Sequence, residues 1–224
     1  MSMVAIPFAV DIEKVKAVFG CRNSELLEQI KTAGLYDIYA GQDDDFPDPK
    51  YLYEFDEALE DILFNYIKPE DRRSKSSFLG LIRPKPVTGL NENIAHGYGY
   101  VLLVICDYLG TQLIQDCDGF YYGRDLKAAY EILKENGLQV NLLKMFEPYQ
   151  LFDIPKIADF PVINYFTRED IEHINSIMDK VEINEDEADD FKDDFDEVQW
   201  TLKNIRDCFR ACKEKNTELV TFTH

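Results

Sequence analysis

Histidine, cysteine and tryptophan are scarce in this chain of 224 residues, which holds three, five and one of them. An odd number of scattered cysteines does not make a disulfide framework, so we expect reduced thiols in a reducing compartment. Cys208 and Cys212 lie four residues apart, but a zinc site needs two further ligands that the sequence does not offer as a second close pair. We interpret both as buried apolar groups and expect neither a metal site nor a cofactor.

Basic residues are also few, with 24 lysines and arginines against 43 acidic residues and a formal net charge of −19. Such a charge repels phosphate backbones and anionic lipids, which disfavours nucleic acid and membrane surfaces and favours a basic protein partner. Solubility alone is the simpler explanation of the same charge. Apolar runs stay far below the ~20 residues that span a bilayer, and no basic-then-apolar leader is present. We therefore expect a soluble, cytoplasmic protein.

What the chain does contain is enough apolar material for a core. Apolar residues make up 46% and aromatic residues 13%, which is typical of a folded protein and indicates one domain over residues 1–224. The most apolar stretch is Ile94 to Gly110, in which only Asp107 is charged between Tyr100 and Leu109. It predicts a core helix over 95–109 that other elements cover on most sides.

Short β-type runs lie at both ends of the chain, at 4–10 and 218–224, and we expect them to pair. Pro7 predicts an edge strand or a bulge for the first of them. A third short strand is predicted at 162–166, and the runs at 112–114 and 120–122 would form a hairpin. Helical periodicity predicts helices over 12–19, 25–32, 51–67, 124–136, 168–180 and 193–216. The predicted fold class is α+β, mostly helical, with a small sheet around the terminal strands.

Three polar segments interrupt this pattern: a mobile acidic loop at 41–50, a basic loop at 68–93 and an acidic segment at 182–194. The first superficially resembles a calcium-binding loop. Pro47 and Asp48 occupy the fifth loop position and the one that needs glycine, so calcium binding is disfavoured. Glu169 and His173 share one helical face as two possible metal ligands, but an exposed pair is the favoured interpretation.

The best candidate for a ligand site is the start of the central helix, where His96, Tyr98 and Tyr100 alternate with glycines. A helix start offers free amide groups, and histidine is ionisable near neutral pH. A histidine that only caps or packs the helix start is the more ordinary explanation. The Gly-Tyr-Gly sequence lacks the third glycine of a dinucleotide fingerprint and the lysine of a P-loop.

Four stretches together resemble a family of uncharacterised bacterial proteins, a domain of unknown function: "VDIEKVKAVFG", "HGYGYVLLVICDYLG", "DFPVINYFT" and "IRDCFRACKEKNTELVTFTH". The opening and closing segments are also loosely similar to the YfbM-like uncharacterised proteins. The resemblance implies a bacterial cytosolic protein without an assigned activity, and it transfers no catalytic residue.

No catalytic motif stands out, and a non-enzymatic protein is favoured over an enzyme. We expect an acidic protein-binding module, similar to an immunity protein or an antitoxin-like inhibitor, that meets a basic partner. The alternative is a small-ligand-binding protein or an enzyme with a pocket near His96, Tyr98 and Tyr100. The candidate partner-binding residues are the aspartates of the two acidic segments: Asp43, Asp44, Asp45, Asp189, Asp190, Asp193 and Asp194.

Overall fold

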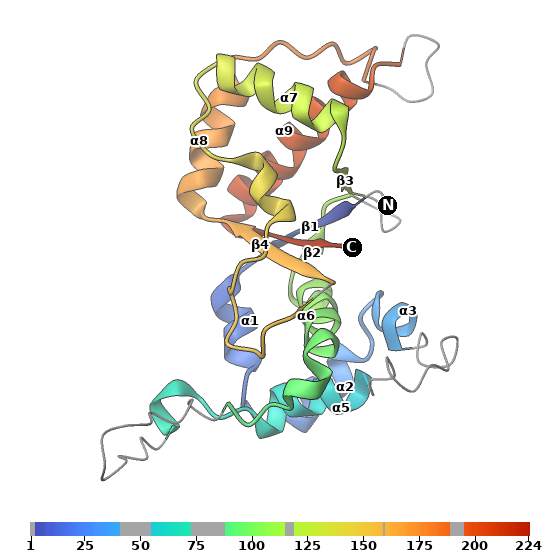
Figure 1. The fold of residues 1–224 in the computed structure, drawn as a ribbon, viewed down its shortest axis with the longest axis vertical. Helices are drawn as coiled ribbons and strands as arrows, with labels where there is room; N and C mark the ends of the chain where they lie inside the picture. The colour runs from blue at the N-terminus through green and yellow to red at the C-terminus, as the bar shows by residue number, and fades with distance from the viewer. Residues whose placement is uncertain (1–2, 41–54, 73–87, 115–118, 159, 189–194) are drawn as a thin grey trace. The chain divides into compact units, whose positions relative to one another are not determined.

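The computed structural model describes residues 3–40, 55–72, 88–114, 119–158, 160–188 and 195–224. They form two compact units (Figure 1). The first unit comprises Met1–Ile12, Leu109–Leu151 and Asp159–His224, and the second comprises Glu13–Tyr108 and Phe152–Ala158. That residues 1–224 form a single domain stays a prediction.

The sheet of the first unit is built around the two terminal strands, as the sequence predicted. β1 (Val4–Val10) pairs antiparallel with β5 (Glu218–Thr223), in a register that runs from Ala5 opposite Thr223 to Val10 opposite Glu218. On its other side β5 pairs antiparallel with β4 (Val162–Phe166). The strand order is therefore β2-β1-β5-β4.

The predicted hairpin between 112–114 and 120–122 is wrong. The two segments form β2 (Thr111–Gln112) and β3 (Phe120–Tyr121), and both pair with β1. The edge of β1 that β5 leaves open is long enough to take both segments, so they pair with it one after the other.

The same arrangement explains how Pro7 fits an interior strand, where an edge strand or a bulge was expected. In an antiparallel strand the nitrogen and the carbonyl oxygen of one residue point to the same neighbour. The Pro7 oxygen accepts from the backbone N–H of Leu113 at 3.0 Å, so its donorless nitrogen also faces that side. There β2 pairs at Phe8 and Ala9 and β3 at Val4 and Ala5, which places Pro7 in the gap between them.

Three helices of the first unit lie on one face of the sheet (Figure 1): α7 (Arg124–Glu135), α8 (Arg168–Met178) and α9 (Glu197–Lys215). Thr167 and Asp170 form a capping box at the start of α8. The ring of Phe166 meets that of Phe209 edge to face at 5.1 Å. Buried apolar side chains from all three helices and the sheet join in this core, among them Ala9, Leu133, Ile174, Ile205, Phe209 and Leu219.

Two connections of the first unit also pack on its elements. A short 3-10 helix covers Leu142–Phe146, and its Met145 oxygen accepts from the Thr223 hydroxyl at 2.8 Å. The part of the acidic segment that the structure describes, 182–188, is held against α9. The backbone N–H of Asn184 donates to the Gln199 side chain at 3.0 Å, and Ala188 is buried.

The second unit consists of helices and connecting segments. Asn23 caps the second helix by accepting from two backbone N–H groups. The expected helix over 51–67 is seen from Phe55 as an α-helix that continues into a π-helical turn. The elements are α1 (Ile12–Val18), α2 (Ser24–Ile30), α3 (Tyr36–Ala40), α5 (Phe55–Glu60), the π-helix at Asp61–Asn65, 3-10 turns at Pro69–Asp71 and Glu92–Ile94, and α6 (Ala95–Leu109).

The central helix α6 has the predicted bounds and the predicted environment. Its residues from Val101 to Cys106 are all completely buried. Its only charged residue, Asp107, accepts from the backbone N–H of Leu35 at 2.9 Å and so joins α6 to the residue that precedes α3. The helix is apolar on all sides in this stretch, and other parts of the unit cover it on all sides, as expected for a core helix.

Of the predicted basic loop at 68–93, the structure describes only residues 68–72 and 88–93. A backbone hydrogen bond beside these two ends joins them. The N–H of Ile67 donates to the Thr88 oxygen at 2.7 Å. Arg72 forms an ion pair with Asp153 and donates to the Ile67 oxygen at 3.0 Å. The acidic loop at 41–50 lies outside the described residues.

A small antiparallel sheet beside a majority of helix confirms the α+β class. In the described part of the chain, no helix is both long enough and apolar enough to cross a membrane.

Candidate functional site

Tyr98, the middle of the three predicted ligand residues, lies at the core of the second unit. Its side chain is 0% exposed. Its hydroxyl donates to Oδ2 of Asp61 at 2.7 Å and accepts from the backbone N–H of Asn91 at 2.8 Å. Burial and the hydrogen bond to Asp61 hold the pKa of Tyr98 above its ordinary value. The hydroxyl is thus fully used inside the unit.

Asp61 opens the π-helical turn and is 8% exposed. Its Oδ1 accepts from the Asn65 side chain at 2.6 Å, and its backbone oxygen accepts from the Tyr66 N–H at 2.9 Å. Gly89 packs on this turn: a Cβ there would lie 2.1 Å from the Asn65 oxygen, and its φ of +81° favours glycine. The buried carboxylate therefore fixes α6, the π-helical turn and the segment before α6 to one another.

His96 and Tyr100 are half-buried on either side of Tyr98 along the chain. The Tyr100 ring stacks on that of Tyr39 at 5.3 Å. The structure brings Tyr98 into the buried network and leaves the other two nearer the surface. That the three residues line a ligand pocket stays a prediction.

The seven aspartates predicted to meet a partner (Asp43, Asp44, Asp45, Asp189, Asp190, Asp193 and Asp194) lie outside the described residues.

No group of three or more side chains suited to a metal ion occurs in the described ranges. His173 uses its Nε2 to accept from the backbone N–H of Gln139 at 3.1 Å. Cys208 and Cys212 are buried, and burial raises the pKa of both thiols, that of Cys212 to about 12. Their interpretation as buried apolar groups is confirmed.

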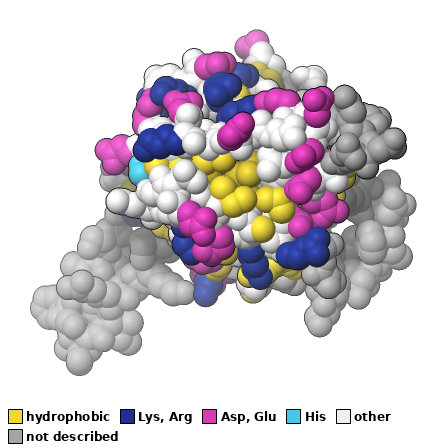
Figure 2. Space-filling view, turned by 90° about the horizontal axis from the view of Figure 1, so that it is seen from above, with side chains coloured by type: hydrophobic (Ala, Val, Ile, Leu, Met, Phe, Trp, Pro, Cys, Tyr) yellow, Lys and Arg dark blue, Asp and Glu magenta, His cyan; other side chains and the backbone are white. Residues whose placement is uncertain are grey.

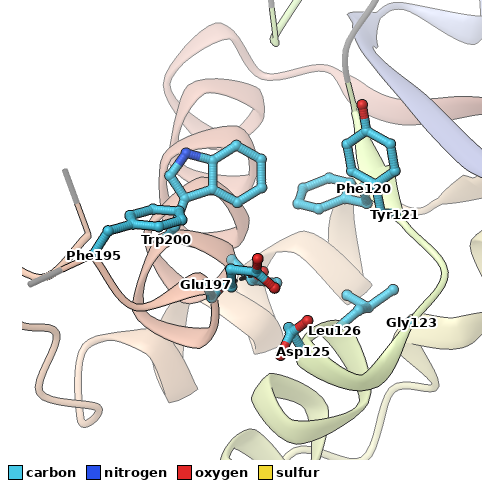
Figure 3. A pocket seen from close by; sticks show the side chains of 9 residues that line it. Phe120, Tyr121, Gly123, Asp125, Leu126, Phe195, Glu197 and Trp200 are labelled. Carbon is cyan, nitrogen blue, oxygen red and sulfur yellow. Dashed lines mark hydrogen bonds between the residues drawn. The ribbon is translucent and has the colours of Figure 1, made fainter. Parts of the chain in front are cut away.

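The first unit contains a pocket of about 380 Å³ that the sequence did not predict. One wall comes from β3 and the start of α7, and the other comes from the start of α9 and the residues before it (Figure 3). It is lined by Phe120, Tyr121, Gly123, Asp125, Leu126, Phe195, Glu197, Trp200 and Thr201. The volume lies within the roughly 300–1,000 Å³ of pockets that take small ligands.

Aromatic rings form much of this lining. In Figure 3 the rings of Trp200 and Phe120 face the same space from opposite walls, and Phe195 lies beside Trp200. Phe120 is buried, whereas Phe195 is 38% exposed and Tyr121 is 49% exposed. We name the lining residues together the aromatic–acidic pocket. Exposed apolar side chains that form a contiguous patch are typical of interaction sites, whereas single scattered ones are not.

Two carboxyl groups complete the pocket. Each lies at the start of a helix, which offsets the repulsion between their negative charges. Asp125 lies in the first turn of α7, and Glu197 is the first residue of α9. The positive ends of the two helix dipoles favour acidic side chains at both positions. Asp196 caps α9 by accepting from the backbone N–H groups of Val198 and Gln199 at 2.7 and 3.0 Å, which fixes the helix start.

The two carboxyl groups lie near each other on the lining of the pocket (Figure 3). The proximity of Asp125 raises the pKa of Glu197, and the proximity of Glu197 lowers the pKa of Asp125. Arg124 pairs with Oδ1 of Asp125 at 3.1 Å and is otherwise largely exposed. Within the described residues, no basic side chain lies within ion-pair distance of Glu197.

This combination suits a positively charged organic group. Aromatic faces attract cations through the ring quadrupole, and carboxylates accept hydrogen bonds from N–H donors. The hydroxyl of Thr201 donates to the Glu197 backbone oxygen at 2.7 Å and is not available as a nucleophile. The lining offers no cysteine, histidine or lysine either.

Sequence reasoning missed this pocket although one signal was present. Glu197 and Trp200 are three residues apart on α9, so the chain's only tryptophan shares a helical face with a carboxylate. Phe195, the residue before the N-cap of this helix, is 38% exposed. The opposite wall lies more than 70 residues earlier, at a distance that no local pattern bridges.

The chain is thus an α+β protein with an open aromatic–acidic pocket. The family described as "Domain of unknown function (DUF7691)" matches residues 87–224, more than half of the chain, and the chain belongs to it. The expected membership of an uncharacterised family is confirmed, whereas the looser similarity to YfbM-like proteins stays a prediction. All pocket residues fall within the matched range. No curated protein and no solved structure matches the chain.

Proposed function

We propose that the protein is a non-enzymatic binding module for a basic protein partner, similar in role to an immunity protein or an antitoxin-like inhibitor. The observation that carries this proposal is the aromatic–acidic pocket, which presents open rings beside Glu197, a carboxylate unpaired by any described basic side chain. The net charge of −19 supports it, because a field of that sign accelerates association with a basic partner.

Three other acidic residues of the first unit have basic partners. Glu185 pairs with Arg206, Glu131 with Lys134 and Glu172 with Lys213. Figure 2 shows acidic and basic side chains interspersed around a hydrophobic centre on the face viewed from above. The described surface there is mixed in sign, so the proposal assigns specific recognition to the pocket and only attraction at a distance to the net charge.

The proposal places the protein in the bacterial cytoplasm. Four cysteines in the described part of the chain are free, in keeping with a reducing compartment: Cys21, Cys106, Cys208 and Cys212. The alternative of an enzyme or small-ligand binder near His96, Tyr98 and Tyr100 gains no support from the contacts of Tyr98, whose hydroxyl is used within the core.

A salt titration tests the proposal. The tagged full chain is purified from its native cells at low salt, copurified proteins are identified, and each basic one is then purified and titrated against the chain by calorimetry. We expect one basic protein to bind with an affinity that falls as salt rises, because salt screens the attraction between exposed charges. The absence of such a partner, or an affinity indifferent to salt, would contradict the proposal.

A further inference from the structure

We infer that the aromatic–acidic pocket receives the side chain of one arginine of the partner protein, with the guanidinium between the aromatic walls and the carboxyl pair. This inference rests on the proposed function and names the group that the pocket selects. The pocket should bind arginine more tightly than lysine or a quaternary ammonium. Its ligand should be a protein side chain and not a free guanidinium compound.

The lining favours a weakly hydrated cation. Phe120, Leu126 and Trp200 supply apolar surface around the cavity. A cation that enters must lose much of its water there, and a guanidinium is hydrated more weakly than the compact ammonium of lysine. Its planar group also stacks on aromatic faces such as that of Trp200, which lines the pocket (Figure 3).

The carboxyl pair separates arginine from a quaternary ammonium. Asp125 and Glu197 together offer four oxygens at one end of the pocket, and Arg124 uses one of them, Oδ1 of Asp125. A guanidinium carries five N–H donors in a fixed fork that matches this array, whereas a quaternary ammonium carries none. The contact of Arg124 shows that this carboxylate accepts from a guanidinium on its solvent side.

The size of the pocket agrees with a side chain carried by a protein. A volume of about 380 Å³ exceeds what a guanidinium alone fills, which leaves room for the aliphatic stem and for part of the partner's backbone. Tyr121 and Phe195, both exposed at the rim, can cover that stem. A site for free arginine would also need groups for its α-ammonium and α-carboxylate, and no lysine or arginine belongs to the lining.

Tryptophan fluorescence makes the test direct, because Trp200 is the only tryptophan in the chain and lines the pocket. Arginine with an acetylated amino group and a methylamide in place of its carboxyl group is titrated into the full chain at constant ionic strength. The same is done with the equivalent lysine compound, with choline and with free arginine. The readout is the saturable change in Trp200 emission.

We expect the blocked arginine to saturate in the millimolar range, as suits a single side chain without the rest of an interface. It should bind at least about tenfold more tightly than blocked lysine and choline. Free arginine should bind no more tightly than its blocked form. The double variant Asp125→Asn/Glu197→Gln should lose the response, whereas Glu214→Gln, an exposed charge on the same helix outside the lining, should keep it.

Four results would overturn the inference: no saturable response, equal or tighter binding of lysine or choline, much tighter binding of free arginine, or an unchanged response in the double variant. Circular dichroism of each variant verifies that it is folded. These outcomes are separable from the proposed function. A salt-dependent partner that binds the double variant normally would contradict the inference alone, and a blocked arginine that binds where no basic protein does would contradict the proposed function alone.

Discussion

The two units place a carboxylate among aromatic rings in opposite ways. In the second unit Asp61 is 8% exposed, and its oxygens accept from Tyr98 and Asn65. In the first unit Glu197 stands at an open pocket, facing Asp125 and two aromatic walls. A buried carboxylate must find donors inside the protein, whereas an exposed one can keep its oxygens for a ligand.

The difference separates structural from functional polar groups. The network of Asp61 and Tyr98 is closed, so its removal should cost stability. The pair at the pocket is open, so its removal should cost binding and little stability. The predictions below test this contrast, beginning with the largest expected change in the free energy of unfolding.

Tyr98→Phe should lower the free energy of unfolding by about 1–3 kcal/mol, because it leaves Oδ2 of Asp61 and the N–H of Asn91 buried without their partner. Chemical denaturation followed by circular dichroism measures the change. Following Trp200 emission in the same experiment also tests the single-domain prediction, which requires one common midpoint.

Tyr108→Phe is the matched control in the same helix, since its exposed hydroxyl donates to Gln29 at 2.9 Å. It should change stability by no more than about 0.5 kcal/mol. Equal effects of Tyr98→Phe and Tyr108→Phe would show that the network around Asp61 is not structural.

Asn175→Ala should lower the stability of the first unit by about 1–2 kcal/mol. The Asn175 amide donates to the backbone oxygens of Ile171 and Phe209 at 2.8 and 2.9 Å, and so joins α8 to α9. The midpoint of thermal unfolding is compared between Asn175→Ala and Ser176→Ala. The Ser176 hydroxyl is exposed, so its removal serves as the control. If both substitutions shift the midpoint equally, the hydrogen bonds of Asn175 between α8 and α9 do not contribute to stability.

A smaller effect depends on pH. Burial lowers the pKa of His224 below its ordinary value, so the native state holds the neutral form while the unfolded state binds a proton first. Stability should therefore be fully present above about pH 6.5 and should decline as pH falls below that value. Denaturation of His224→Gln across the same range should show a shallower decline, and an identical decline in both proteins would contradict this assignment.

Glu197→Gln should give the smallest change in stability of the four. The side chain is exposed, and its loss removes a like-charge neighbour of Asp125. The unfolding midpoint should stay close to that of the unaltered protein. A loss as large as that of Tyr98→Phe would mean that the carboxyl pair is a structural network like the one around Asp61.

The elements with strong periodicity were predictable. The core helix over 95–109 depends on a continuous apolar pattern, and the structure confirms it. The capping box of Thr167 likewise depends on residues within one turn. The pairing of the terminal strands followed from two apolar runs that each needed a partner. The hairpin failed because its segments found a longer strand, β1, that is distant in sequence.

The pocket was not predictable because it joins segments that are distant in sequence. In the sequence, Asp125 and Glu197 are each an ordinary acidic residue in the first turn of a predicted helix. Only the packing of α7 on α9 brings them together. The interpretation of Tyr98 was limited in the same way, since its partner Asp61 lies 37 residues earlier.

The most direct test uses the basic partner that the copurification experiment identifies. Its affinity is measured for three proteins: the unaltered chain, Glu197→Gln and Glu214→Gln. Both variants lose one negative charge from α9, but only Glu197 lines the pocket. Calorimetry should show that Glu197→Gln weakens binding about tenfold or more, while Glu214→Gln stays within about twofold. Equal affinities for the two variants would contradict the claim that the pocket recognises the partner.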